Sequence, residues 1–164
     1  MKRAPIKPGP GQESVWDYPR PAIMEPTSKR LRIVFEGTTL ADTRSAFRVL
    51  ETSHPPTYYL PPSDIDTERL RSSGKRSFCE WKGEASYFDL VGAEKTVRAA
   101  AWCYPNPSSA FAAMAGYISF YAHAVDACDV DGEMVQAQEG DFYGVWITGD
   151  VVGPFKGAPG TWGW

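Results

Sequence analysis

Side chains that can do chemistry are concentrated in one segment, residues 79–87 (CEWKGEASY). Lys82 lies there between Trp81 and Gly83, where one predicted strand ends and the next begins. From such a break, a lysine can direct its ammonium into the concave face of a sheet. It would bind an anion there or, when desolvated, act as an acid or form a Schiff base. The alternative is a solvent-exposed lysine beside a bulge glycine, which is the usual state of an isolated lysine.

A second group of candidates lies on the strand predicted over residues 96–104. Alternate side chains of a strand share one face, and on this strand one face carries Arg98, Ala100, Trp102 and Tyr104. If the strand pairs with residues 84–91, Tyr87 and Trp102 line the same pocket. The small alanines at 99–101 either leave room for a ligand or allow close packing between sheets.

Acid–base chemistry has one further candidate, His54. It follows Glu51 by three residues and stands close to Tyr58 and Tyr59 in a proline-rich stretch. A carboxylate beside a histidine can transfer protons, although a histidine in a loop is more often a turn residue. Cys79 is a weak candidate nucleophile, because no pattern of histidines supports it.

The sequence predicts neither a metal nor a cofactor. Cys79, Cys103 and Cys128 lack the paired spacing of a zinc site. The pairs Asp64-x-Asp66 and Asp129-x-Asp131 lie in predicted turns, where aspartate is favoured for local hydrogen bonding. Neither glycine-rich phosphate-binding motif is present.

Charge and length exclude several classes of function. The 164 residues carry a formal net charge of −3, which disfavours nucleic-acid binding because such binding depends on neutralising phosphates. Two short basic clusters, within 29–32 and 69–76, are interpreted as solvated edges, with an anion site as the alternative. Sparse cysteines, no 18-residue apolar run and no signal peptide at 1–10 predict a cytoplasmic protein that does not contact membranes.

The elements that must position these residues are mainly β-strands. Aromatic residues make up 13% of the chain, and 15 glycines and 14 prolines exclude a coiled coil or a helical bundle. About eight to ten short strands are expected from the spacing of turn signals. Turns are predicted at Glu36-Gly37, 72–75, 92–95 and Asp131-Gly132, and one strand at 142–148. We therefore expect a single compact antiparallel β domain, a sandwich or a partly open barrel, with one short helix at 107–115.

The domain is expected to span residues 29–148, with a distinct segment at each end. Residues 1–28 contain six of the 14 prolines and form an extended arm that carries Trp16 and Tyr18. Residues 149–164 form a tail that is rich in glycine and tryptophan, and we expect it to pack on the domain.

Three ordered motifs resemble those of a known family, over roughly residues 30–125. The segment 79–88 (CEWKGEASYF) is similar to its C-P-W-K-G-x-A-x-Y-aromatic motif. Residues 101–105 (AWCYP) are similar to its A-W-x-Y-P element, and 116–121 (GYISFY) to its G-hydrophobic-x-F-Y element. The family is the bacterial and fungal domain of unknown function 427, which is also catalogued under a nucleotidyltransferase-like name.

This resemblance implies a compact, mostly antiparallel β fold and implies little about activity. Nucleotidyl transfer needs carboxylates that hold Mg²⁺ beside a glycine-led triphosphate loop, and neither stands next to the matched motifs. Glu80 replaces the proline of the family motif, which places a carboxylate near Lys82.

Three functions follow as hypotheses. The first is a binding module for a small molecule, with an aromatic wall of Trp81, Tyr87, Trp102 and Tyr104, and Lys82 and Arg98 for an anionic group. The second is an enzyme that uses Lys82, Glu80 and His54. The third is a homodimeric interaction domain, in which aromatic residues of the arm and tail bury against a neighbour. These residues are Trp16, Tyr18, Trp146, Trp162 and Trp164.

Overall fold

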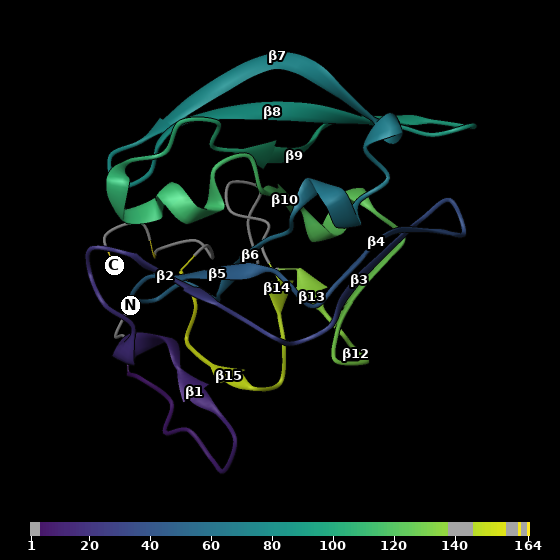
Figure 1. Ribbon diagram of the computed structural model, residues 1–164. Helices are drawn as coiled ribbons and strands as arrows, with labels where there is room; N and C mark the ends of the chain where they lie inside the picture. Colours follow the sequence, from purple (N-terminus) through teal and green to yellow (C-terminus); the bar gives the residue numbers. More distant parts are fainter. Residues whose placement is uncertain (1–3, 138–145, 157–160, 162–163) are drawn as a thin grey trace.

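A computed structural model describes residues 4–137, 146–156, 161 and 164. The chain is mainly β, as predicted, and its larger sheets are antiparallel. Figure 1 shows one four-stranded sheet above the others, in the order β10-β9-β8-β7. Its strands are β7 (Leu70–Cys79), β8 (Gly83–Val91), β9 (Thr96–Cys103) and β10 (Ile118–Phe120).

Two further sheets lie below this upper sheet. One has the order β12-β11-β3-β4 and the other the order β2-β5-β6. The described strands form open sheets and no closed barrel. The strands of these two sheets are β2 (Ile23–Pro26), β3 (Leu31–Phe35), β4 (Thr38–Thr43), β5 (Phe47–Leu50), β6 (Thr57–Tyr59), β11 (Ala127–Val130) and β12 (Glu133–Met134).

The main core fills the space between the upper sheet and the β3 sheet. Leu31, Ile33 and Phe35 of β3 are fully buried, while the residues between them are only half-buried, which confirms the predicted period of two. They pack with Leu90 of β8 and Phe120 of β10. A second, smaller core lies at the other end of the upper sheet, where β9 faces β6.

One predicted turn is wrong. Residues 72–75 do not end a strand, because β7 runs without interruption from Leu70 to Cys79 and the chain reverses at 80–82. Pairing shifts from Ser72↔Phe88 to Arg76↔Ser86, so two extra residues of β7 form a bulge. Gly74 has a φ of 80° there. Glycine at positive φ suits a bulge as well as a turn, which explains the error.

The short helix expected at 107–115 is present as a single 3₁₀ helix, η4 (Ser109–Met114), which buries Phe111 and Met114. Four other 3₁₀ turns are found among the described residues. They are η1 (Val15–Asp17), η2 (Pro62–Asp64), η3 (Thr67–Arg69) and η5 (Ala122–Ala124). The described residues contain no helix with the length and apolarity needed to cross a membrane.

The segments near the two ends of the chain pair with each other. β1 (Glu13–Ser14) runs parallel to β15 (Val151–Val152), and in Figure 1 the two chain ends lie on the same side of the molecule. The Trp16 ring packs at 5.3 Å from that of Trp164, and its Nε1 donates to the Pro154 carbonyl. These aromatic side chains thus contact their own chain, and homodimerisation stays a prediction.

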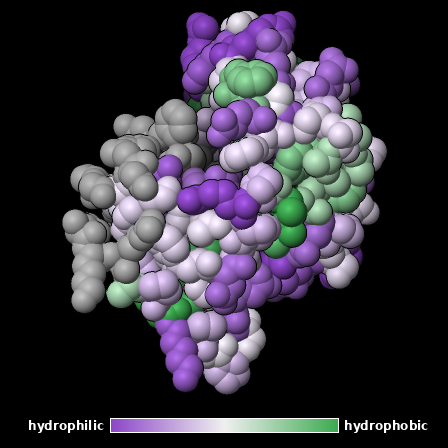
Figure 2. All heavy atoms as spheres, turned by 90° about the vertical axis from the view of Figure 1, so that its left-hand side faces the viewer, coloured by the Kyte–Doolittle hydropathy of each residue, from purple (hydrophilic) through white to green (hydrophobic). Residues whose placement is uncertain are grey.

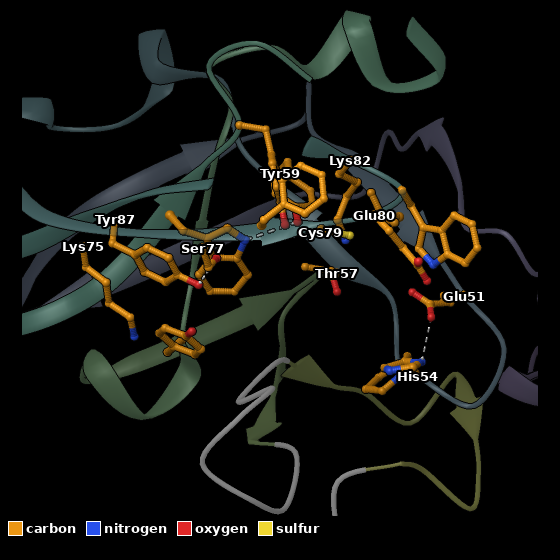
Figure 3. A pocket seen from close by; sticks show the side chains of 17 residues that line it. Glu51, His54, Thr57, Tyr59, Lys75, Ser77, Cys79, Glu80, Lys82 and Tyr87 are labelled. Carbon is orange, nitrogen blue, oxygen red and sulfur yellow. Dashed lines mark hydrogen bonds and ion pairs between the residues drawn. The ribbon is translucent and has the colours of Figure 1, made fainter. Parts of the chain in front are cut away.

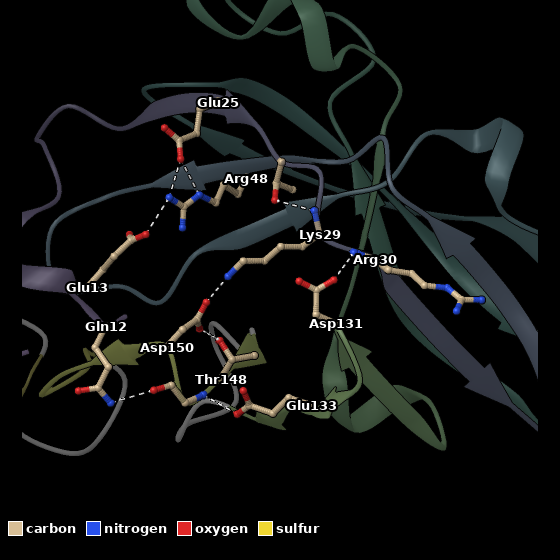
Figure 4. A network of polar contacts seen from close by, with 12 residues as sticks. Gln12, Glu13, Glu25, Lys29, Arg30, Arg48, Asp131, Glu133, Thr148 and Asp150 are labelled. Carbon is tan, nitrogen blue, oxygen red and sulfur yellow. Dashed lines mark hydrogen bonds and ion pairs between the residues drawn. The ribbon is translucent and has the colours of Figure 1, made fainter. Parts of the chain in front are cut away.

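Charged side chains join this end of the molecule to the neighbouring sheets (Figure 4). Arg48 of β5 pairs with Glu13 and Glu25, and Lys29 pairs with Asp150 next to β15. A further two-stranded sheet pairs β13 (Gln136–Ala137) with β14 (Trp146–Ile147). The rest of the strand predicted at 142–148, residues 142–145, lies outside the described residues, as does Trp162.

Glu36 fastens the turn between β8 and β9 to the turn after β3. Its carboxylate accepts hydrogen bonds from the backbone N–H groups of Ala93, Glu94 and Lys95. These bonds hold the pKa of the carboxyl below its usual range. Gly92 permits the approach, since a Cβ at that position would lie 2.3 Å from the Glu36 carboxyl carbon.

Replacing Glu36 by Gln is expected to lower the melting temperature at pH 7, because the amide offers one acceptor oxygen in place of a carboxylate. The native pKa is depressed, so the stabilisation is complete above the unfolded value of about 4.3 and is lost as the pH falls through the native pKa. Thermal melts should therefore show the gap between wild type and E36Q narrowing below about pH 4.3. Glu94→Gln, at an exposed neighbouring position, serves as the control. A difference in melting temperature between wild type and E36Q that does not change with pH would contradict this role of the Glu36 carboxylate.

Val15 of the arm is fully buried, against Leu50 and Val151 among others. Val15→Ala removes two buried methyl groups and should cost about 2 kcal/mol of unfolding free energy in urea titrations. Ile6→Ala, at a position 53% exposed, should cost less than about 0.5 kcal/mol. Equal values for the two variants would show that the arm does not belong to the cooperative core.

Candidate functional site

A cavity of about 490 Å³ lies beneath the β7–β8 hairpin, between the upper sheet and β5–β6. Figure 2, viewed from the hairpin end, shows mainly hydrophilic residues on the upper sheet above a hollow. Figure 3 shows the lining side chains converging on this space. Seven of them are aromatic: Tyr59, Phe78, Trp81, Tyr87, Trp102, Tyr104 and Tyr121.

The base of the cavity is built on Trp102. Its Nε1 donates to the Tyr59 hydroxyl at 3.3 Å, and its ring lies 4.6 Å from that of Tyr121. Burial raises the pKa of Tyr59 and of Tyr104, so both phenols stay neutral at physiological pH. The base is therefore a rigid, uncharged aromatic surface.

Six of the seven predicted site residues line this cavity, and Arg98 does not. A bulge in β9 accounts for the exception. Register passes from Leu90↔Val97 to Phe88↔Ala101, so β9 has two more residues than β8 in this interval. Ala99 takes a φ of 50°, and its N–H donates to the buried Asp89 carboxylate at 2.8 Å. The predicted alternation breaks there, and Arg98 is left exposed outside the lining.

The turn at 80–82 holds Lys82 at the rim of the cavity. Ser108 fixes this turn, since its N–H donates to the Lys82 carbonyl and its hydroxyl to the Trp81 carbonyl. Gly83 follows with a φ of 108°, a conformation that favours glycine. The Lys82 ammonium lies 5.5 Å from the Tyr104 ring centroid. It forms no ion pair with a carboxylate of the described residues.

Lys75 and Ser77 also line the cavity, although neither was predicted from the sequence as a site residue. The Lys75 ammonium lies 4.6 Å from the Tyr87 ring centroid, and the Ser77 and Tyr87 hydroxyls are 2.9 Å apart. Lys75 forms no ion pair with the described carboxylates. The i, i+2, i+4 spacing of Lys75, Ser77 and Cys79 would place all three on one face of a strand. The turn predicted at 72–75 hid this pattern, because it placed Lys75 outside the strand.

His54 closes the side of the cavity opposite Lys75, next to Glu51 (Figure 3). Because a carbonyl only accepts, Nδ1 donates to the Thr52 carbonyl at 2.9 Å, and Nε2 carries a lone pair. Burial lowers the pKa of His54, so the ring is neutral at pH 7. Glu51 lies 3.9 Å from Nδ1, and Glu80 lines the same side.

The three thiols occupy separate positions. Cys79 is half-buried and lines the cavity, whereas Cys103 and Cys128 are buried. Burial raises the pKa of Cys103 and brings that of Cys128 to about 12, so neither is a thiolate at pH 7. Within the ranges that the structure describes, no three His, Cys, Asp or Glu side chains gather as metal ligands.

Comparison with known proteins places the chain in a family. No curated protein matches the chain. The family described as a domain of unknown function (DUF427) matches residues 23–131. That range is more than half of the chain and includes the three motif segments, 79–88, 101–105 and 116–121. Each of these segments supplies side chains to the cavity lining. The chain therefore belongs to the DUF427 family.

Proposed function

We propose that this DUF427 chain is a binding module for a small planar molecule that carries an anionic group. One observation carries the proposal: the cavity is walled by aromatic rings, and two ammonium groups lie on those rings without a carboxylate partner among the described residues. Its volume of about 490 Å³ falls within the usual range for small-molecule sites.

The aromatic residues favour a planar ligand. Offset or tilted ring pairs contribute about 0.5–1.5 kcal/mol each beyond the burial of their surface. Trp102 is already held by Tyr59 and Tyr121, so little conformational freedom is lost when a ligand packs on it.

The lysines favour an anionic group on that ligand. An ammonium against an aromatic ring is stabilised by the ring but keeps its charge and its donors. Lys75 and Lys82 can therefore donate to a carboxylate or phosphate, and hydrogen bonds to charged groups contribute about 1.5–3 kcal/mol. His54 is neutral at pH 7 and adds no positive charge of its own.

The proposal is tested with 2-naphthoate and its uncharged analogue 2-naphthalenemethanol in thermal-shift titrations. Naphthoate should bind more tightly, and at 100 times its Kd it should add about 2.7 kcal/mol of stability, a rise in Tm of roughly 5–10 °C for a chain of this length. The double variant K75A/K82A should bind both probes equally.

Lys95→Ala is the matched control, because the Lys95 ammonium also lies on an aromatic ring, 5.7 Å from the Phe35 centroid, but outside the cavity. It should preserve the preference for naphthoate. The proposal is wrong if naphthoate, 1-naphthyl phosphate and AMP all leave the Tm unchanged, or if the double variant keeps the wild-type preference.

A second candidate function is hydrolysis, which is favoured because His54, Glu80 and Lys82 lie on one side of the cavity. For a probe such as 1-naphthyl phosphate, Nε2 of neutral His54 would take a proton from water as the water oxygen bonds to phosphorus. The bond from phosphorus to the naphthyl oxygen would break, and Lys82 would protonate the leaving oxygen.

Release of fluorescent 1-naphthol measures this reaction directly. A hydrolase should release it in wild type and lose at least 100-fold in rate in His54→Gln, the usual contribution of a general base. Wild type that binds 1-naphthyl phosphate, shifts its Tm and yet releases no naphthol would refute hydrolysis and leave the binding module in place.

A further inference from the structure

The two lysines lie at chemically different ends of the cavity. In Figure 3, Lys75 lies with Ser77 and Tyr87 on one side, and Lys82 with Glu80, Glu51 and His54 on the other. We infer that the anionic group of the ligand binds at the end formed by Lys75, Ser77 and Tyr87, called here the Lys75 end, and that the rest of the ligand points toward His54 and Lys82. This inference rests on the proposed function and gives the ligand an orientation.

The Lys75 end offers donors and no carboxylate. The lining residues Lys75, Ser77 and Tyr87 contribute one ammonium and two hydroxyls. The hydroxyls of Ser77 and Tyr87 are hydrogen-bonded at 2.9 Å, so one donates to the other and one hydroxyl hydrogen remains for a ligand.

The opposite end is electrically balanced. Glu51 and Glu80 line it together with Lys82, and Lys156 acts on His54 from outside the lining. An anion that approached Lys82 would also approach two carboxylates, whereas an anion beside Lys75 would meet none in the lining. Coulomb repulsion between like charges therefore directs a carboxylate or phosphate to the Lys75 end.

The bulge in β7 is what brings Lys75 to this position. Ser73 Oγ accepts from the Lys75 N–H at 3.0 Å, and Gly74 takes a φ of 80° with open space around it. From the last residue of the bulge onward, Lys75, Ser77 and Cys79 all line the cavity, as alternate residues of one strand. Bulges commonly redirect side chains beside functional sites, and here the bulge adds a cation to the wall.

The ligand class that fits is a planar molecule with its anionic group at one end and an uncharged or hydrogen-bonding group at the other. The ring system would cover Trp102 and Tyr59 at the base of the cavity. Its far end would face the neutral His54 ring, the Lys82 ammonium and the Glu80 carboxylate, which together can accept or donate hydrogen bonds.

Single variants test the orientation. The preference for 2-naphthoate is measured by isothermal titration as the Kd of 2-naphthalenemethanol divided by the Kd of 2-naphthoate. Lys75→Ala should lower this ratio roughly tenfold or more, since a hydrogen bond to a charged group is lost. Lys82→Ala and the control Lys95→Ala should leave it within about twofold, and Ser77→Ala should weaken naphthoate binding severalfold. Thermal melts of each variant without probe establish that it is folded.

The orientation is overturned if Lys82→Ala removes the preference, or if both single variants lower it equally, and in either case the proposed binding function survives. Should the folded wild type bind none of naphthoate, 1-naphthyl phosphate and AMP, the binding function itself fails and the orientation fails with it. A ratio that falls only in Lys75→Ala supports both.

Discussion

The contact between Trp102 of β9 and Tyr59 of β6 joins the two sheets that enclose the cavity. Tyr59 belongs to a three-stranded sheet and Trp102 to the four-stranded one, and their rings meet edge to face with one hydrogen bond between them. Next to this contact, Leu60 and Ile118 exchange backbone hydrogen bonds, so β6 and β10 are tied as well. The position of every cavity-lining residue on β7 and β8 depends on this junction, because those strands extend from β9.

The upper sheet packs against different cores at its two ends, and its strands β7 and β9 each contain a bulge. At one end, Leu90 packs into the main core, and at the other, Ala85 and Tyr87 face the smaller core and the cavity. A regular sheet of alternating residues would keep one set of side chains on one face throughout. The bulges at 73–75 and 98–100 interrupt that alternation. The cavity lies at the end of the sheet that faces the smaller core.

Local patterns in the sequence were sufficient to predict strands with regular alternation and hairpins with standard turn residues. The alternation in 31–35 and the turn residues Glu36-Gly37 and Asp131-Gly132 predicted the observed strands and hairpins. The matched motifs contain Trp81, Lys82, Tyr87, Trp102 and Tyr104, and these side chains line one cavity. Failures occurred where a bulge breaks periodicity: Lys75 was hidden in a supposed turn, and Arg98 was expected in the lining but is exposed outside it. Only the pairing partner reveals an extra residue in a strand.

The pairing of β1 with β15 bears on the order in which the protein folds. Glu13 and Val151 are partners although nearly the whole chain separates them, and contacts of such long sequence separation form late because loop closure costs entropy. During synthesis, residues 13–14 leave the ribosome long before residues 151–152, so β1 has no partner strand until residue 152 is added. The sheets can assemble in the meantime, and Val15 can pack on Leu50 before Val151 completes its burial.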